Sequence, residues 1–152
     1  MSDPDSIHNN IIASYKENLG LDITLQPVPW SDYLANLNQP DMPYQMFYLG
    51  WIADYPDPQN FLEILFHSES AQNYGGYHNP KVDELLNQAR GTQDTAERLA
   101  LYRDVEQMLL DDAAWIPLYF ETEYWLVKPT VKNFTIPPMK APKFQYVYIE
   151  AQ

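Results

Sequence analysis

The chain has 152 residues, 45% of them hydrophobic, which is enough for a domain with a sizeable core. Acidic residues outnumber basic ones by 21 to 9, and the formal net charge of −12 disfavours nucleic acid and anionic membrane surfaces as partners. No apolar run is long enough to cross a bilayer, and no secretory leader follows Met1. The sequence therefore predicts either a cytoplasmic protein or a chain that begins partway through a longer one.

The first fifty residues alternate between helical and strand-like patterns. Apolar residues at helical spacing predict a first helix that ends at Gly20, and residues 21–26 then alternate as a half-buried strand does. A short helix is expected over residues 30–37, followed by a strand over residues 44–50. This order of helix, strand, helix and strand indicates an α/β layer.

The stretch 50–61 connects the second expected strand to a third helix. Asp57 followed by Pro58 has the pattern of a helix N-cap and the first helical residue. Asp54 has no evident structural role, and it lies at the end of a strand, where ligands bind in α/β sheets. From the residues alone, Asp54 is either a ligand-binding carboxylate or a turn-forming aspartate. Trp51 either lines a cleft or belongs to the core.

Two further helices are expected after the polar segment 67–79. Asn79 and Pro80 repeat the pattern of a cap followed by proline, which predicts a helix start. Asp94 and Glu97 have the spacing of a capping box and predict the start of the longest helix.

The hydrophobic pattern changes from helical spacing to strand-like alternation at Trp115. Alternating apolar residues predict successive strands from there to Ile149, including strands near 131–136 and 145–149. The segment 137–142 is too rich in proline for regular structure. Few helices are left in this region to cover these strands.

Neither a metal site nor a catalytic site is expected. The three histidines are scattered, with no spacing typical of metal ligands. Asp54, Asp57 and Glu63 suggest the carboxylate pair of a glycosidase, but Asp57 is expected to cap a helix and Glu63 to lie on one. An autonomous acidic hydrolase or interaction domain is the alternative from a different functional class.

Six motifs follow one another along nearly the whole chain. They are WIADYPDPQNFL at 51–62, YHNPKVDELL at 77–86, ERLALY at 97–102, IPLY at 116–119, LVKP at 126–129 and YVYI at 146–149. Together they resemble the motifs of the oligopeptide- and dipeptide-binding family of bacterial extracellular solute-binding proteins, family 5, which serve peptide ABC transporters.

The resemblance implies an α/β fold class, with a periplasmic-binding-protein-like type II lobe in which helices flank a mixed sheet. Members of that family are much longer than this chain and have two lobes joined by a hinge, so the resemblance implies a C-terminal fragment. Residues 1–118 would form part of the second, C-terminal ligand-binding lobe. Residues 119–152 would form the hinge crossing and the strands that return to the absent first lobe.

The function implied is the substrate-binding component of a peptide ABC transporter, not an enzyme, which captures oligopeptides between two lobes and delivers them to a membrane permease. By resemblance, Asp54 forms a salt bridge with the peptide's α-amino group and Trp51 walls a side-chain pocket. Tyr48 stands where the oligopeptide branch can carry a basic residue for the ligand's C-terminal carboxylate. Tyr55 completes the predicted ligand-binding residues, and no cofactor is expected.

The resemblance also implies an extracytoplasmic location, either periplasmic or lipid-anchored at the outer face of the cell membrane, and the absence of cysteine suits an exported protein. Nickel complexes and oligosaccharides remain as alternative solutes within the family. A fragment would expose apolar surface and unpaired strand edges around residues 119–149. We therefore expect it to self-associate.

Overall fold

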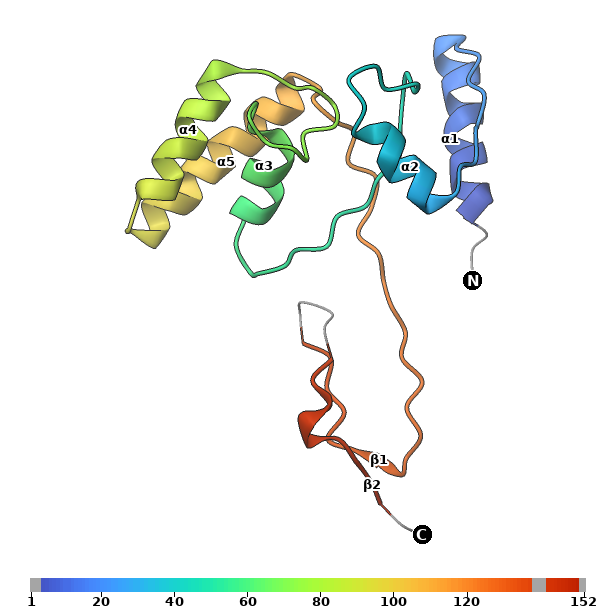
Figure 1. The fold of residues 1–152 in the computed structure, drawn as a ribbon, viewed down its shortest axis with the longest axis vertical. Coiled ribbons are helices and arrows are strands. Elements are labelled where there is room, and N and C mark those ends of the chain that lie inside the picture. Colours follow the sequence, from blue (N-terminus) through green and yellow to red (C-terminus); the bar gives the residue numbers. More distant parts are fainter. Residues whose placement is uncertain (1–3, 138–141, 151–152) are drawn as a thin grey trace. The chain divides into compact units, whose positions relative to one another are not determined.

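Five α-helices carry most of the regular structure in the computed structural model, which describes residues 4–137 and 142–150 (Figure 1). The chain divides into two units, Met1–Pro43 and Tyr44–Gln152, and each has its own contacts. None of the helices in the described ranges combines the length with the apolar character that a membrane span requires.

The first unit holds two helices, α1 (Pro4–Leu19) and α2 (Trp30–Leu37), as the sequence predicts. Helix α1 ends where expected, because Gly20 adopts a φ of +68° that favours glycine and donates its N–H to the carbonyl of Lys16 at 3.1 Å. Leu37 is the buried side chain of α2.

Helix α3 (Gln59–Phe66) is the first helix of the second unit, with Pro58 at its N-cap position. The expected capping residue is Asp57, one residue before Pro58. Its carboxylate accepts the N–H of Gln59 at 3.0 Å. The predicted helix after the central stretch is thus confirmed.

Helices α4 (Pro80–Gly91) and α5 (Thr95–Asp111) also begin at their predicted caps. The Asn79 side chain accepts the N–H of Lys81, with Pro80 at the first helical position. The Asp94 side chain accepts the N–H of Glu97 at 2.8 Å.

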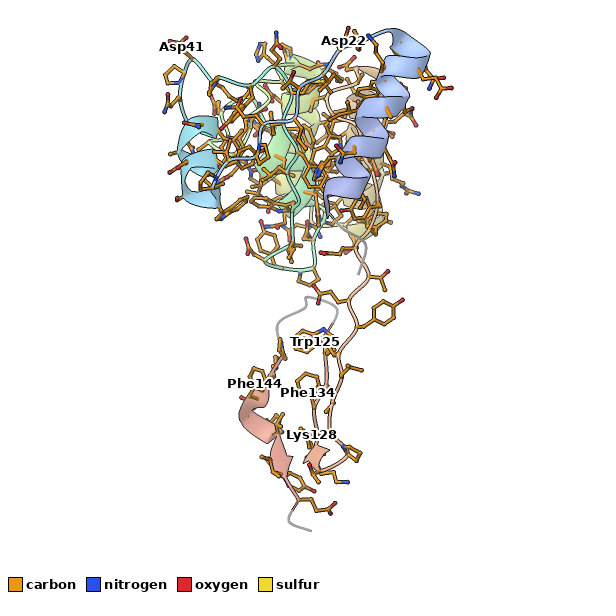
Figure 2. All side chains as sticks on the ribbon, turned by 90° about the vertical axis from the view of Figure 1, so that its right-hand side faces the viewer. Asp22, Asp41, Trp125, Lys128, Phe134 and Phe144 are labelled. Carbon is orange, nitrogen blue, oxygen red and sulfur yellow. The ribbon has the colours of Figure 1, made fainter. Side chains whose placement is uncertain are left out.

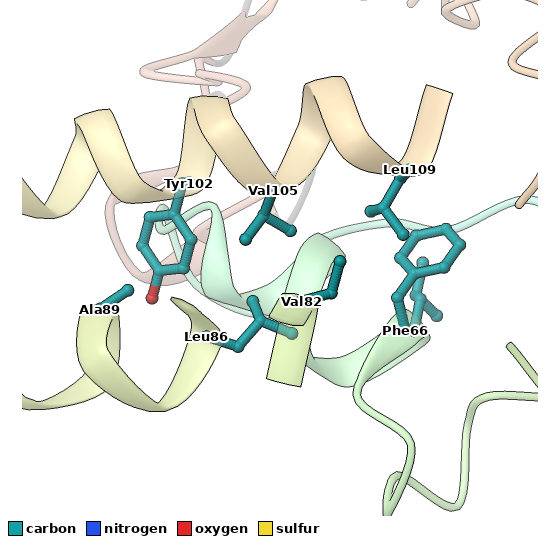
Figure 3. Packing of buried hydrophobic residues seen from close by; sticks show 8 residues of the cluster. Phe66, Val82, Leu86, Ala89, Tyr102, Val105 and Leu109 are labelled. Atoms are coloured by element: carbon teal, nitrogen blue, oxygen red, sulfur yellow. The ribbon is translucent and has the colours of Figure 1, made fainter. Parts of the chain in front are cut away.

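The core of the second unit lies where α4 packs along α5, with α3 across them. Figure 3 shows side chains of α5 pointing toward those of α4, and Phe66 of α3 close to one end of the cluster. The buried members are Leu65, Phe66, Val82, Leu86, Ala89, Tyr102, Val105 and Leu109. Burial of this apolar surface supplies the main driving force for the three-helix packing.

The expected strands are mostly not formed. In the described part of the chain, one sheet is present, in which β1 (Val131–Lys132) pairs antiparallel with β2 (Tyr148–Ile149). The segments 21–26, 44–50 and 115–126 have no strand assignment. A strand needs hydrogen bonds to a neighbouring strand, and these segments have no such neighbour among the described residues.

Aromatic side chains contact one another in the C-terminal part. Phe134 lies 5.6 Å from Trp125 and 6.2 Å from Phe144 between ring centroids, and the three rings are labelled in Figure 2. Phe144 begins a short 3₁₀ turn, η1 (Phe144–Tyr146), where the sequence predicted the start of a strand. The described residues thus form a helix-rich α/β arrangement with one small sheet.

The structure tests neither the predicted division into two lobes nor the predicted proline-rich loop in full. The predicted division between residues 118 and 119 stays a prediction. Of the proline-rich loop 137–142, residues 138–141 lie outside the described residues.

Candidate functional site

Asp54 lies in the non-helical connection that precedes α3, and its side chain is exposed. Its backbone N–H donates to the amide oxygen of Asn60 at 3.1 Å. In the described ranges of the chain, the Asp54 carboxylate has no hydrogen bond or ion pair. The backbone at this position is therefore held while the charge faces outward, which differs from a turn-forming aspartate that satisfies its own backbone.

Trp51 is half-buried and packs against the core cluster. Its indole Nε1–H donates to the same Asn60 oxygen at 3.0 Å. Core contact is thus one role of Trp51, and the lining of a ligand cleft stays a prediction. The structure brings Trp51 and Asp54 together through a residue that the sequence reading did not single out.

Asn60 is a buried polar side chain, 2% exposed, in the first turn of α3. The sequence contains a signal for the burial of Asn60. Asn60, Glu63 and His67 follow helical spacing, and the positions between them are apolar. All three are buried; Asn60 and Glu63 each make a polar contact with another segment, and His67 makes one two residues ahead of itself. Glu63 pairs with Arg90 of α4, and the Nδ1 atom of His67 accepts the N–H of Glu69.

Asp57 has a structural role. One carboxylate oxygen accepts the N–H of Gln59, and the other lies 2.6 Å from Nη1 of Arg98 on α5. The end of the connection is therefore tied both to the start of α3 and to a neighbouring helix. The expectation that Asp57 caps a helix is confirmed.

Tyr48 and Tyr55 contact other residues than Asp54. The Tyr48 hydroxyl lies 2.7 Å from the hydroxyl of Tyr119, and this hydrogen bond, together with burial, raises the pKa of Tyr48 to about 12. The Tyr55 hydroxyl donates to the side-chain oxygen of Gln59.

An open hollow lies between α3 and α5, and it includes none of the four predicted ligand-binding residues. Its lining residues are Pro58, Leu62, Leu99, Tyr102, Arg103 and Glu106. The hollow thus touches the end of the connection at Pro58 but does not include Asp54.

The carboxylates considered for catalysis are engaged elsewhere. Asp57 and Glu63 each pair with an arginine, Arg98 and Arg90, so neither is available as an unpaired acid or base beside Asp54. Across the part of the chain that the structure describes, no group of three His, Cys, Asp or Glu side chains is placed to hold a metal ion.

The arrangement offers one outward carboxylate, on a residue whose backbone N–H shares the Asn60 oxygen with a fixed indole. An exposed carboxylate with open acceptor positions pairs well with an ammonium group, which supplies a positive charge and three donors. The indole supplies a flat apolar surface three residues earlier in the chain.

Comparison with known proteins gives consistent matches. The sequence model described as "Bacterial extracellular solute-binding proteins, family 5 Middle" matches residues 2–73. The chain is 32% identical over 136 residues to the oligopeptide-binding protein OppA of Bacillus subtilis (strain 168), which covers 90% of this chain and 25% of OppA. It is 35% identical over 136 residues to the "Probable deoxycholate-binding periplasmic protein YgiS" of Escherichia coli (strain K12), covering 90% of this chain and 24% of YgiS.

A solved structure is similar over almost all of the chain. The murein tripeptide binding protein MppA of Escherichia coli matches with a TM-score of 0.87 and 29% identity, over 97% of this chain and 29% of MppA. The chain thus spans about a quarter of the length of the relatives that it matches. It is similar to the bacterial extracellular solute-binding proteins of family 5 over residues 2–73, and to peptide-binding proteins over nearly its whole length.

Proposed function

We propose that this chain is part of the substrate-binding component of a peptide ABC transporter and supplies one wall of the site that captures an oligopeptide. The relatives named for binding oligopeptides and murein tripeptide support this class of ligand. Because the chain spans about a quarter of their length, the opposite wall comes from the rest of a longer two-lobed protein. Residues 1–118 then belong to the second lobe, and residues 119–152 cross back toward the first.

The observation that carries the proposal is the outward, unpaired carboxylate of Asp54. In a closing cleft, a single carboxylate is costly unless a positive charge meets it, and the α-amino group of a peptide is such a charge. Trp51 and Tyr55 would contact the first residues of the peptide. Tyr48, whose side chain is an uncharged phenol, would offer a hydroxyl rather than a positive charge to the ligand.

The protein captures its ligand without converting it and works outside the cytoplasm, in the periplasm or anchored at the outer face of the cell membrane. Relatives named as periplasmic binding proteins support both points. Capture would shift the population from an open to a closed form, because the peptide contacts both lobes. The closed form would then dock on a membrane permease.

The test is titration calorimetry on the complete protein that carries this segment, with a tripeptide and with its N-acetylated form. Asp54→Asn should weaken binding of the free tripeptide by about 2–5 kcal/mol, because the ligand's buried ammonium loses its partner. The N-acetylated tripeptide, which lacks that charge, should bind the variant and the unaltered protein equally. The two peptides therefore report on the amino group alone.

Asp104→Asn is the matched control, because it removes the same charge from an exposed position on α5. It should leave both affinities unchanged. If Asp54→Asn weakens both peptides equally, Asp54 does not bind the amino group. Recovering the tripeptide intact after the titration tests the absence of peptide turnover.

A steroid acid is the second candidate ligand, because YgiS is named as a deoxycholate-binding protein. Deoxycholate is an anion, and the Asp54 carboxylate would repel it. Binding of deoxycholate that strengthens in Asp54→Asn, with no binding of the tripeptide, would favour this candidate over the peptide.

A further inference from the structure

The amide oxygen of Asn60 joins the two residues on which the proposed function rests. It accepts the indole N–H of Trp51 at 3.0 Å and the backbone N–H of Asp54 at 3.1 Å. An amide oxygen has two acceptor positions, so two donors satisfy it fully. One buried atom therefore sets the distance between the indole and the backbone that carries the carboxylate.

Asn60 is itself fixed by the helix that carries it. Its backbone N–H donates to the carbonyl of Asp57 at 3.1 Å, and its side chain is 2% exposed. Helix α3 is anchored in the core through Leu65 and Phe66, and Glu63 ties the helix to α4. The position of the Asn60 oxygen is thus set by helix packing together with the bond to Asp57, at the end of the connection away from Trp51.

The connection itself has no regular structure to hold it in place. Residues 51–53 have no secondary structure, and residues 54–57 form bends before the turn at Pro58. Bonds to side chains fix this segment at two points, Asn60 near its start and the pairing of Asp57 with Arg98 at its end. Loss of the first would release Asp54 while leaving the second in place.

We propose that Asn60 is a positioning residue for ligand recognition, which holds the Asp54 carboxylate and the Trp51 indole in the arrangement that reads a peptide's amino terminus. This inference rests on the proposed function of Asp54. A charge-assisted hydrogen bond needs a short distance and good alignment, so a carboxylate on a loosened segment pairs less well with an ammonium group. Holding the segment before the ligand arrives also removes the cost of ordering it on binding.

The test is a double-mutant cycle on the complete protein. Its readout is the dissociation constant of the N-acetylated tripeptide divided by that of the free tripeptide. Asn60→Ala removes both acceptor bonds and should lower this ratio about tenfold while the N-acetylated peptide keeps its affinity. In the Asp54→Asn background, Asn60→Ala should change the ratio by less than about twofold, because no carboxylate is left to position.

Asn60→Gln is the conservative variant, because it keeps a neutral amide oxygen as an acceptor and adds no charge beside Asp54, and it should retain more of the ratio than Asn60→Ala. A residue with a merely structural role would lower the affinity for both peptides together and leave the ratio unchanged. Should Asn60→Ala fail to fold, Asn60→Ser takes its place, since it is small and polar and cannot reach both donors. The N-acetylated peptide then reports whether the site is still assembled.

The outcomes separate this inference from the proposed function. If Asp54→Asn lowers the ratio and Asn60→Ala does not, the positioning role is overturned and the role of Asp54 stands. If Asp54→Asn itself leaves the ratio unchanged, the proposed reading of the amino terminus fails, and the role of Asn60 fails with it. A drop in the ratio for Asn60→Ala that persists in the Asp54→Asn background also overturns the inference.

Discussion

The carboxylate of Asp83 fixes the segment that follows α3 to helix α4. It accepts the backbone N–H of Ser68 at 2.9 Å and the Ser68 hydroxyl at 2.6 Å. Burial raises the pKa of Asp83, but the two hydrogen bonds from Ser68 and the nearby His67 and His78 lower it by more, so its pKa in the folded state lies below the ordinary value.

Ser68→Ala should lower the free energy of unfolding at pH 7 by about 1 kcal/mol, because it removes one hydrogen bond to the Asp83 carboxylate. A folded-state pKa below the unfolded value of about 3.9 means that the carboxylate's contribution is fully present above that value and is lost as the pH falls through the folded-state pKa. The difference between Ser68→Ala and the unaltered chain should therefore shrink at acid pH. Urea unfolding followed by circular dichroism at a series of pH values measures it.

Ser31→Ala is the control for this prediction. The Ser31 hydroxyl makes a long contact, 3.3 Å, with the exposed Asp32, so its removal should change the free energy of unfolding by less than about 0.5 kcal/mol. An effect of Ser68→Ala that is the same at pH 7 and at the acid end of the series would contradict the role given to the carboxylate.

Residue types and spacing predict a side chain's role well when the role is local. Asp57 bonds the N–H two residues ahead, and the sequence pattern predicts that bond. The role of Asn60 is not local in the same sense, because its oxygen reaches back to Trp51, across a connection whose path depends on how α3 packs. A helical pattern marks position 60 as buried, but it does not say which donors meet the side chain there.

At the scale of elements, the pairing of α4 with α5 holds the second unit together. Leu86 is fully buried between the two helices, and Figure 3 shows it beneath Val105 and Tyr102. Leu86→Ala should lower the free energy of unfolding by about 2–5 kcal/mol, because it removes buried methyl groups and leaves a cavity. Urea unfolding measures the loss, and the helical circular dichroism signal reports whether the native helices remain.

Leu110→Ala is the matched control, because Leu110 lies on α5 but is 46% exposed. It should cost less than about 1 kcal/mol, since little of the side chain is taken from water. Equal losses for the two variants would show that the interface between α4 and α5 is not the main source of stability.

Helix starts and strands differ in how much of their cause lies nearby in the sequence. Asn79 and Asp94 bond N–H groups two and three residues ahead, so the sequence contains the whole reason for the helix start. A strand depends on a partner that can lie anywhere, and the expected strands at 21–26 and 44–50 have none in the described chain. Alternation therefore predicts an extended, half-buried segment but not the sheet that it joins.

At the scale of the whole molecule, apolar side chains are exposed along the segment between α5 and β1. Phe120 and Leu126 are fully exposed, at 100% and 102%, and Tyr124 is 89% exposed. The backbone of this segment has no strand partner among the described residues. Exposed apolar side chains on an extended backbone favour pairing with another chain, so we expect the isolated chain to self-associate as its concentration rises.

Replacing Phe120 and Leu126 together by serine should shift the chain toward monomer, because it removes the apolar surface and leaves the three-helix core untouched. Sedimentation velocity over a range of concentrations measures the shift, and urea unfolding should be unchanged. Serine at Leu19 and Leu110, which are exposed on α1 and α5, is the control and should leave association as it was. If the unaltered chain stays monomeric at high concentration, this segment does not mediate self-association. Association that is equal in both double variants would place the contact elsewhere on the molecule.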